Sequence, residues 1–138
     1  MGKIIAFSAI LLTAIAARAD IVWPTTSKDF AQGKPATEFL QPTVSGKPMS
    51  GAFGDVRNNG YRFHEGIDIK PISRNRNGEP LDDIYAAIDG KVVLINKIAG
   101  NSGYGRYVVM THPSCDVGVY TLYAHLSEID PNISGHRL

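Results

Sequence analysis

Short apolar runs alternate with turn residues through the second half of the chain, and this pattern predicts an antiparallel sheet. The runs rich in β-branched and aromatic residues cover 84–88, 91–95, 106–111 and 119–126. Asp89-Gly90, between the first two runs, is a signal for a type I′ hairpin. The glycine-rich segment 99–105 leads into a strand, not a helix, so it is a hairpin connection and no nucleotide site. We expect an all-β fold with an antiparallel sheet core and almost no helix.

Alternation within 119–126 predicts which side chains share a face of the last strand. The even positions from Tyr120 to Leu126 form the more apolar set, and the odd positions from Val119 to His125 form the more polar set. We expect the even set to face the core, which puts His125 on the polar face. From the residues alone, a structural and a functional role for His125 stay equally open.

The segment 20–48 has no sustained helical or strand periodicity. Four prolines among small polar residues favour an extended arm. Its aromatic residues include Trp23, Phe30 and Phe39, and for Trp23 packing against the domain is preferred over substrate binding. The expected organisation is a signal peptide at 1–19, the arm at 20–48 and one β-sheet domain at 49–138.

The first nineteen residues have the three parts of a secretory signal. Lys3 is the positive start, 4–16 is an apolar run interrupted only by Ser8 and Thr13, and Ala17-Arg18-Ala19 fits the cleavage pattern. A membrane anchor would need about 20 apolar residues. We therefore expect an exported protein, periplasmic or extracellular, with no stable membrane anchor after cleavage.

Charge and cysteine content exclude some classes of function. Removal of the signal leaves 12 basic and 13 acidic residues, and no basic cluster is dense enough to indicate a nucleic-acid partner. Cys115 is the single cysteine, so no internal disulfide forms. Its surroundings have turn composition and give no support for a nucleophilic role.

An imidazole and a carboxylate lie four residues apart in His64-Glu65-Gly66-Ile67-Asp68. In a regular strand the two side chains would share a face but lie about 13 Å apart. Zinc holds its ligand atoms at about 2.0–2.2 Å, so both residues can bind one ion only if the backbone bends between them. Gly66 is the residue able to adopt the unusual dihedral angles of such a bend. The alternative is an ordinary half-buried strand with a surface His and Asp.

Three further stretches accompany this motif: FGDVR at 53–57, IDGKV at 88–92 and YAHL at 123–126. Together the four stretches resemble the lysostaphin/LytM-type zinc metallopeptidases, which are mostly peptidoglycan endopeptidases. The resemblance implies that His64 and Asp68 are zinc ligands and that His125 is a catalytic residue beside the metal. It also implies a His-x-His motif with the third ligand, and no such motif occurs before Leu138. We therefore expect the peptidase sheet to be incomplete at its C-terminus.

The chemistry implied by this resemblance is hydrolysis of peptide cross-links in bacterial peptidoglycan, with water activated on Zn²⁺. His125 would orient or deprotonate the water, or stabilise the oxyanion. Because two protein ligands hold zinc poorly, we expect this chain to bind zinc weakly and to be nearly inactive. We interpret His112 as mainly structural, and His136 matches no ligand of the family.

Two other classes of protein stay open besides the zinc peptidases. A non-catalytic relative would use the same sheet to bind cell wall or to regulate another hydrolase, and loss of ligands is what it would show. The intact pair of His64 and Asp68 favours an incomplete enzyme instead. A biotinyl or lipoyl carrier is disfavoured, because Lys91 lies past the turn and leads into an apolar strand.

The signal assignment predicts that export removes 1–19 and leaves Asp20 as the amino terminus. Intact-mass measurement of the exported protein should give the mass of 20–138, and a mass that includes Met1 would contradict the assignment. Ala19→Asp should block processing, because the cleavage site requires a small residue.

Overall fold

The computed structural model describes residues 20–115 and 118–137. The signal peptide predicted for 1–19 lies outside these residues and stays a prediction. Within the two described ranges, no helix combines the length and the apolar character that crossing a membrane requires.

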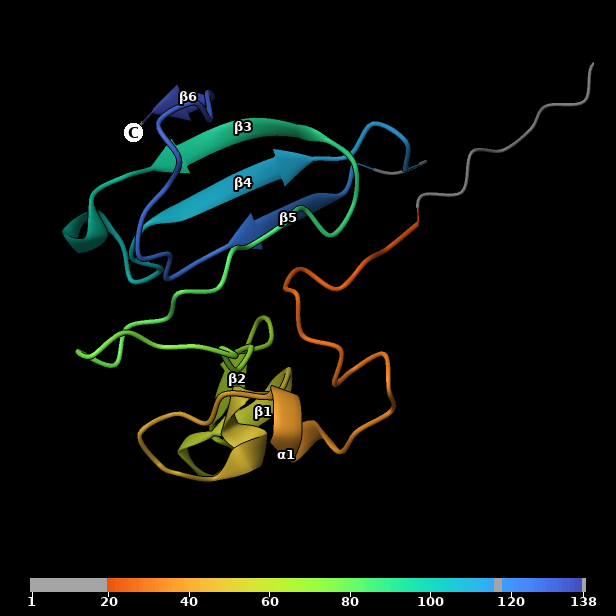
Figure 1. Cartoon of the computed structure of the whole chain (residues 1–138), viewed down its shortest axis with the longest axis vertical. Helices are drawn as coiled ribbons and strands as arrows, with labels where there is room; N and C mark the ends of the chain where they lie inside the picture. Colours follow the sequence, from red (N-terminus) through yellow and green to blue (C-terminus); the bar gives the residue numbers. More distant parts are fainter. Residues whose placement is uncertain (1–19, 116–117, 138) are drawn as a thin grey trace, which may run out of the picture.

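A four-stranded sheet forms the larger part of the fold (Figure 1). Strands β3 (Lys91–Asn96), β4 (Tyr107–Thr111) and β5 (Tyr120–Tyr123) are antiparallel neighbours, and β6 (His136–Arg137) pairs in parallel with β3. The strand order is therefore β5-β4-β3-β6. This arrangement confirms the all-β class and the antiparallel meander of the last three apolar runs. The sequence pattern did not indicate β6.

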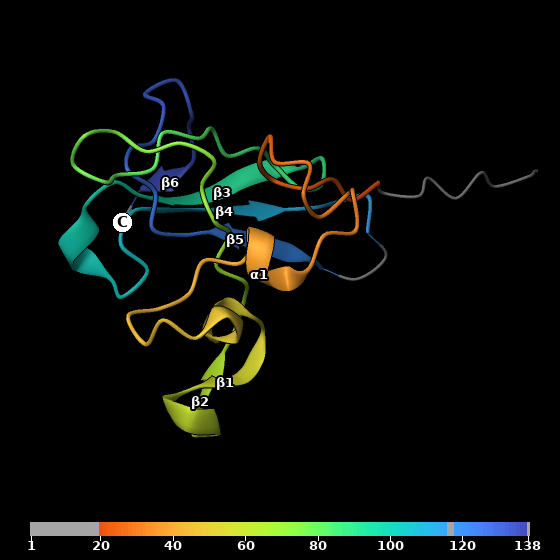
Figure 2. The ribbon, with the colours of Figure 1, turned by 60° about the horizontal axis from the view of Figure 1, so that its bottom comes forward.

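A smaller part of the fold holds the two-stranded antiparallel sheet of β1 (Gly54–Arg57) and β2 (Arg62–His64). It also contains the single-turn helix α1 (Ala36–Phe39) and the 3₁₀ turns η1 (Pro48–Gly51) and η2 (Asn58–Gly60). Figures 1 and 2 both show this part lying to one side of the four-stranded sheet. The glycine-rich loop, with the 3₁₀ turn η3 (Ala99–Asn101), joins β3 to β4 as the predicted hairpin connection.

The predicted hairpin at Asp89-Gly90 is wrong. Residues 84–88 form no strand, and their backbone bonds instead to the N-terminal arm. The Val22 N–H donates to the Ala87 carbonyl at 2.8 Å, and the Tyr85 N–H donates to the Pro24 carbonyl at 2.9 Å. The arm thus occupies the hydrogen-bonding positions that a local hairpin partner would have taken.

Gly90 is required for a close approach of two segments and not for a turn. It lacks the positive φ that a type I′ turn demands at both central positions. A Cβ built on Gly90 would overlap the Thr111 carbonyl oxygen and would lie 2.5 Å from His112 Nδ1. The dipeptide signal in the sequence cannot distinguish these two uses of glycine.

The buried face of β5 is opposite to the one predicted. Tyr120 and Leu122 are exposed, whereas Thr121 and Tyr123 are half-buried. The Tyr123 hydroxyl accepts a hydrogen bond of 2.7 Å from the Ala87 N–H. Burial here follows the hydrogen bonds that the tyrosine and threonine hydroxyls make and not the hydrophobicity of the even positions.

His112 is a structural histidine, as predicted. Its side chain is buried, with Nδ1 at 3.0 Å from the Asp89 carbonyl oxygen and Nε2 at 2.9 Å from the Thr121 hydroxyl. A carbonyl oxygen only accepts, so Nδ1 carries the hydrogen and Nε2 accepts from the hydroxyl. The ring therefore ties the end of β4 to β5 and to the turn before β3.

Trp23 has a packing role, and its aromatic partners belong to the arm itself and not to the domain. Trp23 stacks on Phe30 with ring centroids 4.7 Å apart, and Phe39 meets both rings edge-on at 5.6 Å. The next residue, Leu40, is buried and forms a bridge with Ile69. This cluster fastens the arm beside the segment that carries the His64 and Asp68 motif.

Gly90→Ala should lower stability by about 1–3 kcal/mol, since the added methyl group has to displace the Thr111 carbonyl or the buried His112 ring. Urea unfolding followed by circular dichroism measures the change. Gly100→Ala is the matched control, because a Cβ there meets no atom within 4 Å. Equal unfolding midpoints for the two variants would contradict the close-packing role of Gly90.

Candidate functional site

The chain bends directly after β2 and brings His64 and Asp68 together. The bend lies at residues 65–66, and His64 Nε2 lies 3.4 Å from Asp68 Oδ1. The His64 side chain is 13% exposed and that of Asp68 is 28% exposed. The bend that a shared ion would require is therefore present, and both side chains remain partly accessible.

The predicted reason for Gly66 is wrong. Its φ lies outside the left-handed region, and a Cβ at this position would meet no atom within 4 Å. The bend between His64 and Asp68 is produced instead by contacts on either side of it. Those contacts hold the two functional side chains separately.

His64 is oriented by the backbone before β1. Its Nδ1 lies 2.8 Å from the Ala52 carbonyl oxygen, which can only accept, so Nδ1 carries the hydrogen. The lone pair of a neutral imidazole is then on Nε2, the atom that faces Asp68. A backbone carbonyl on the second ring nitrogen is one of the usual means of fixing a metal-binding histidine.

Asp68 is held by three separate contacts. Its N–H donates to the Gly51 carbonyl and its own carbonyl accepts from the Gln41 N–H, both at 2.8 Å. Its Oδ2 accepts from Arg57 Nη2 at 2.6 Å. Gly51 allows this arrangement because any Cβ there would overlap the Gln41 carbonyl. With Oδ2 bound to Arg57, Oδ1 is the oxygen presented to His64.

His125 lies beyond the end of β5, so the predicted strand alternation does not extend to it. Its side chain is exposed and its backbone is left-handed, with φ 56°. The His125 N–H donates to the Tyr104 carbonyl at 2.9 Å, and the Tyr104 hydroxyl donates to Glu65 Oε2. These two bonds connect the loop around His125 to the residue next to His64.

The loop between β3 and β4, which lies next to His125, is held by a buried side chain of β3. The Asn96 side chain is almost fully buried, and its Nδ2 donates to the Gly105 carbonyl at 2.7 Å and to the Ile98 carbonyl at 3.0 Å. Gly105 is in turn close to His125, since a Cβ there would lie 3.6 Å from His125 Nδ1. The position of His125 therefore depends on a buried amide of β3.

The profile of peptidase family M23 matches residues 62–137. The chain belongs to peptidase family M23. The matched range covers more than half of the chain and contains His64, Asp68 and His125, and it confirms the resemblance to the lysostaphin/LytM-type peptidases. Comparisons with curated proteins and with solved structures gave no match.

The His64 and Asp68 pair of this M23 chain has the spacing of two ligands of one tetrahedral ion. Ligand bonds of about 2.0–2.2 Å separate two donors of a tetrahedral site by roughly 3.3–3.6 Å, and the observed separation is 3.4 Å. With Nδ1 protonated, Nε2 and Oδ1 are both acceptors, and a cation between them removes their mutual repulsion. Across 20–115 and 118–137, however, no three His, Cys, Asp or Glu side chains gather closely enough to hold a metal.

Sequence reasoning missed Arg57, the Ala52 carbonyl and Tyr104. Arg57 lies in the FGDVR stretch at 53–57, just before the His64 motif, and this was the available signal. The spacing of eleven residues gave no indication that its guanidinium reaches Asp68. Tyr104 had no signal, because its partner Glu65 lies 39 residues earlier in the chain.

The bond from Tyr104 to Glu65 raises the pKa of Tyr104, through the hydrogen bond to the carboxylate and then through its charge. A raised pKa in the folded state favours the protonated phenol, so its stabilising effect is fully present below about pH 10 and is lost as the pH rises further. Tyr104→Phe should therefore be less stable than the parent at pH 8, and the difference should shrink above pH 10.

Urea midpoints at both pH values test this expectation. Tyr61→Phe is the control, because Tyr61 is 92% exposed and its hydroxyl has no hydrogen-bond partner among the described residues. A difference for Tyr104→Phe that does not change with pH would contradict the role of the phenolic proton.

Proposed function

We propose that this M23 chain is a zinc metalloendopeptidase for the peptide cross-links of bacterial cell wall peptidoglycan, with an incomplete active site in which the described residues supply two of three zinc ligands. His64 and Asp68 are the zinc ligands and His125 is the catalytic residue in this proposal. The observation that carries it is the 3.4 Å separation of Nε2 and Oδ1, with the opposite ring nitrogen of His64 bound to a backbone carbonyl. Membership of a peptidase family supports hydrolysis as the reaction.

Zinc, when bound, polarises the peptide carbonyl and lowers the pKa of water. The residues of the chain orient the two ligand atoms and transfer the proton. The Ala52 carbonyl keeps the hydrogen of His64 on Nδ1, and Arg57 turns Oδ1 of Asp68 toward the same point. His125 contributes an exposed imidazole, which takes a proton from the attacking water or donates to the oxyanion.

Export and a cell-wall substrate belong together in this proposal. The proposed signal peptide at 1–19 delivers the protein to the periplasm or the outside of the cell, where peptidoglycan is found. A near-neutral charge and the absence of a dense basic cluster in the sequence agree with a peptide substrate and not with nucleic acid.

A non-catalytic relative is the second candidate. The observation that favours it is that the part of the chain covered by the structure supplies two close metal donors but no set of three. Such a protein would use the M23 sheet to bind cell wall or to regulate another hydrolase. Zinc occupancy and hydrolysis separate the two candidates.

Zinc affinity of the purified protein, measured by competition with a chromophoric chelator, tests the ligands. We expect weak binding, since a catalytic zinc site has three protein ligands. His64→Ala and Asp68→Ala should each lower the affinity by at least about tenfold, whereas His125→Ala and the exposed control Asp83→Ala should leave it unchanged. Unchanged affinity in His64→Ala would overturn the site, and loss in His125→Ala equal to that in His64→Ala would make His125 a ligand.

Hydrolysis of purified sacculi in the presence of zinc tests the reaction. If the parent cleaves them, His125→Ala should lower the rate by about 10²–10⁴ with zinc binding retained. Full activity in His125→Ala would remove its catalytic role. Binding to sacculi without release of peptides, at saturating zinc, would favour the non-catalytic candidate.

A further inference from the structure

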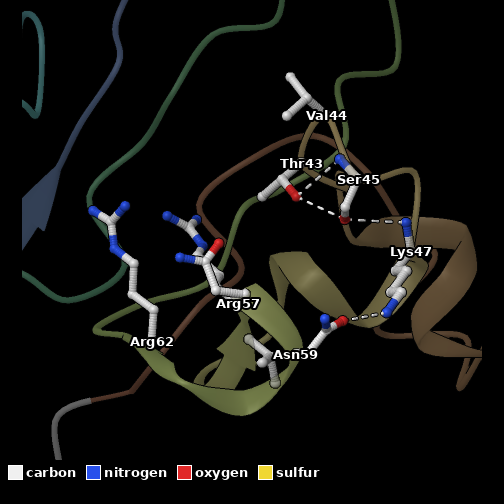
Figure 3. A pocket seen from close by; sticks show the side chains of 9 residues that line it. Thr43, Val44, Ser45, Lys47, Arg57, Asn59 and Arg62 are labelled. Atoms are coloured by element: carbon white, nitrogen blue, oxygen red, sulfur yellow. Dashed lines mark hydrogen bonds between the residues drawn. The ribbon is translucent and has the colours of Figure 1, made fainter.

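An open pocket of about 360 Å³ lies beside the candidate site and shares Arg57 with it. Its lining includes three basic side chains, Lys47, Arg57 and Arg62, and no carboxylate. Figure 3 shows Arg57 and Arg62 on one wall and Lys47 across from them, with the hydroxyl of Thr43 above. The pocket is therefore a concentration of positive charge in a chain that is close to neutral overall.

Two of these cations face each other across the β1 and β2 ladder. Arg57 and Arg62 are register partners, so their side chains leave the same face of the hairpin. Like charges directly opposite each other are destabilising. The carboxylate of Asp68 offsets part of this repulsion by pairing with Arg57, and an anion beside Arg62 would offset more of it.

Only one member of this pair is neutralised within the described part of the chain. Arg57 is paired with Asp68, whereas Arg62 has no carboxylate partner within ion-pair distance among the described residues. Lys47 donates to the neutral Asn59 Oδ1 at 2.8 Å, which orients its ammonium group without balancing its charge. Arg62 and Lys47 thus leave two uncompensated positive charges at the pocket.

The neighbouring turn adds neutral donors. Asn58 and Asn59 both have left-handed backbone, with φ 49° and 57°, and both line the pocket. Because Lys47 occupies Oδ1 of Asn59, the amide nitrogen of Asn59 is left to donate to another acceptor. Cationic and neutral donors together form a site for an oxygen anion.

We propose that this pocket binds a carboxylate of a peptide ligand, with Arg62 and Lys47 as its charge partners. The proposal rests on the proposed function in one respect, the peptide nature of the ligand. Arginine can bind carboxylates through a planar pair of N–H groups, and Arg57 already binds the carboxylate of Asp68 at the inner edge, through Nη2 alone. A peptide held in the pocket by its carboxylate would lie one side chain away from the His64 and Asp68 pair.

The test is a ¹⁵N NMR titration of the purified protein with N-acetyl-trialanine, as the free acid and as the C-terminal amide. We expect the acid to shift the amide signals of Asn58, Asn59 and Arg62 and the amide form to leave them in place. Arg62→Gln should weaken binding of the acid by about tenfold and Lys47→Gln by a similar factor, since each removes one charge-assisted bond. Arg76→Gln, outside the pocket, is the matched control and should change nothing.

Three results would overturn the proposal: equal binding of acid and amide, unchanged binding in Arg62→Gln, or inorganic phosphate binding as tightly as the acid with the same dependence on Arg62. The last result would indicate a general anion site. The titration is repeated in EDTA, so that peptide binding is measured without metal. If the acid still binds in EDTA and the protein does not bind zinc, the pocket is supported as a carboxylate site and the proposed metal chemistry is rejected.

Discussion

The anchoring of Asp68 is the constraint on which the smaller part of the fold depends. Its two backbone bonds, to Gly51 and Gln41, join three separate segments, and its carboxylate adds Arg57 from β1. Ion pairs as exposed as that of Arg57 with Asp68 contribute about 0–1 kcal/mol. Groups that orient metal ligands can affect metal affinity by about 10–100-fold. The main effect of Arg57 is therefore on direction, since it decides which oxygen of Asp68 faces His64.

The larger sheet positions His125 through the loop between β3 and β4. Asn96 on β3 is buried and bonds to the carbonyls of the glycine-rich connection, and that connection holds His125 through the Tyr104 carbonyl. The same tyrosine reaches Glu65 through its hydroxyl. Tyr104 is thus the physical link by which β3 and β4 set the position of His125 relative to β2, although no metal-binding group of three residues results within the described ranges.

The features that could be predicted from sequence are those encoded in short-range patterns. The runs of β3, β4 and β5 and the connection at 99–105 follow from local composition. The errors arise where a distant segment decides the outcome. The arm takes the backbone hydrogen bonds that a strand partner of 84–88 would have made. Hydrogen bonds to His112 and Ala87 decide which face of β5 is buried. Contacts of Asp68 with Gly51 and of His64 with Ala52 hold the bend, and Gly66 needs no unusual backbone conformation. Each of these contacts joins residues at least nine positions apart, beyond the range of a local sequence pattern.

Arg57 has two neighbours that compete for its charge. Nη2 of Arg57 is bound to Asp68. The pocket is lined by Arg57 and by Arg62, its partner across the β1 and β2 ladder. An anion that drew the guanidinium toward Arg62 would release Oδ2 of Asp68 and loosen the orientation of Oδ1 toward His64. By reciprocity, an ion that needs this orientation would weaken anion binding by Arg57 by the same free energy. Arg62 and Lys47 do not bind Asp68, so they can hold a carboxylate in the pocket without disturbing the orientation of Asp68.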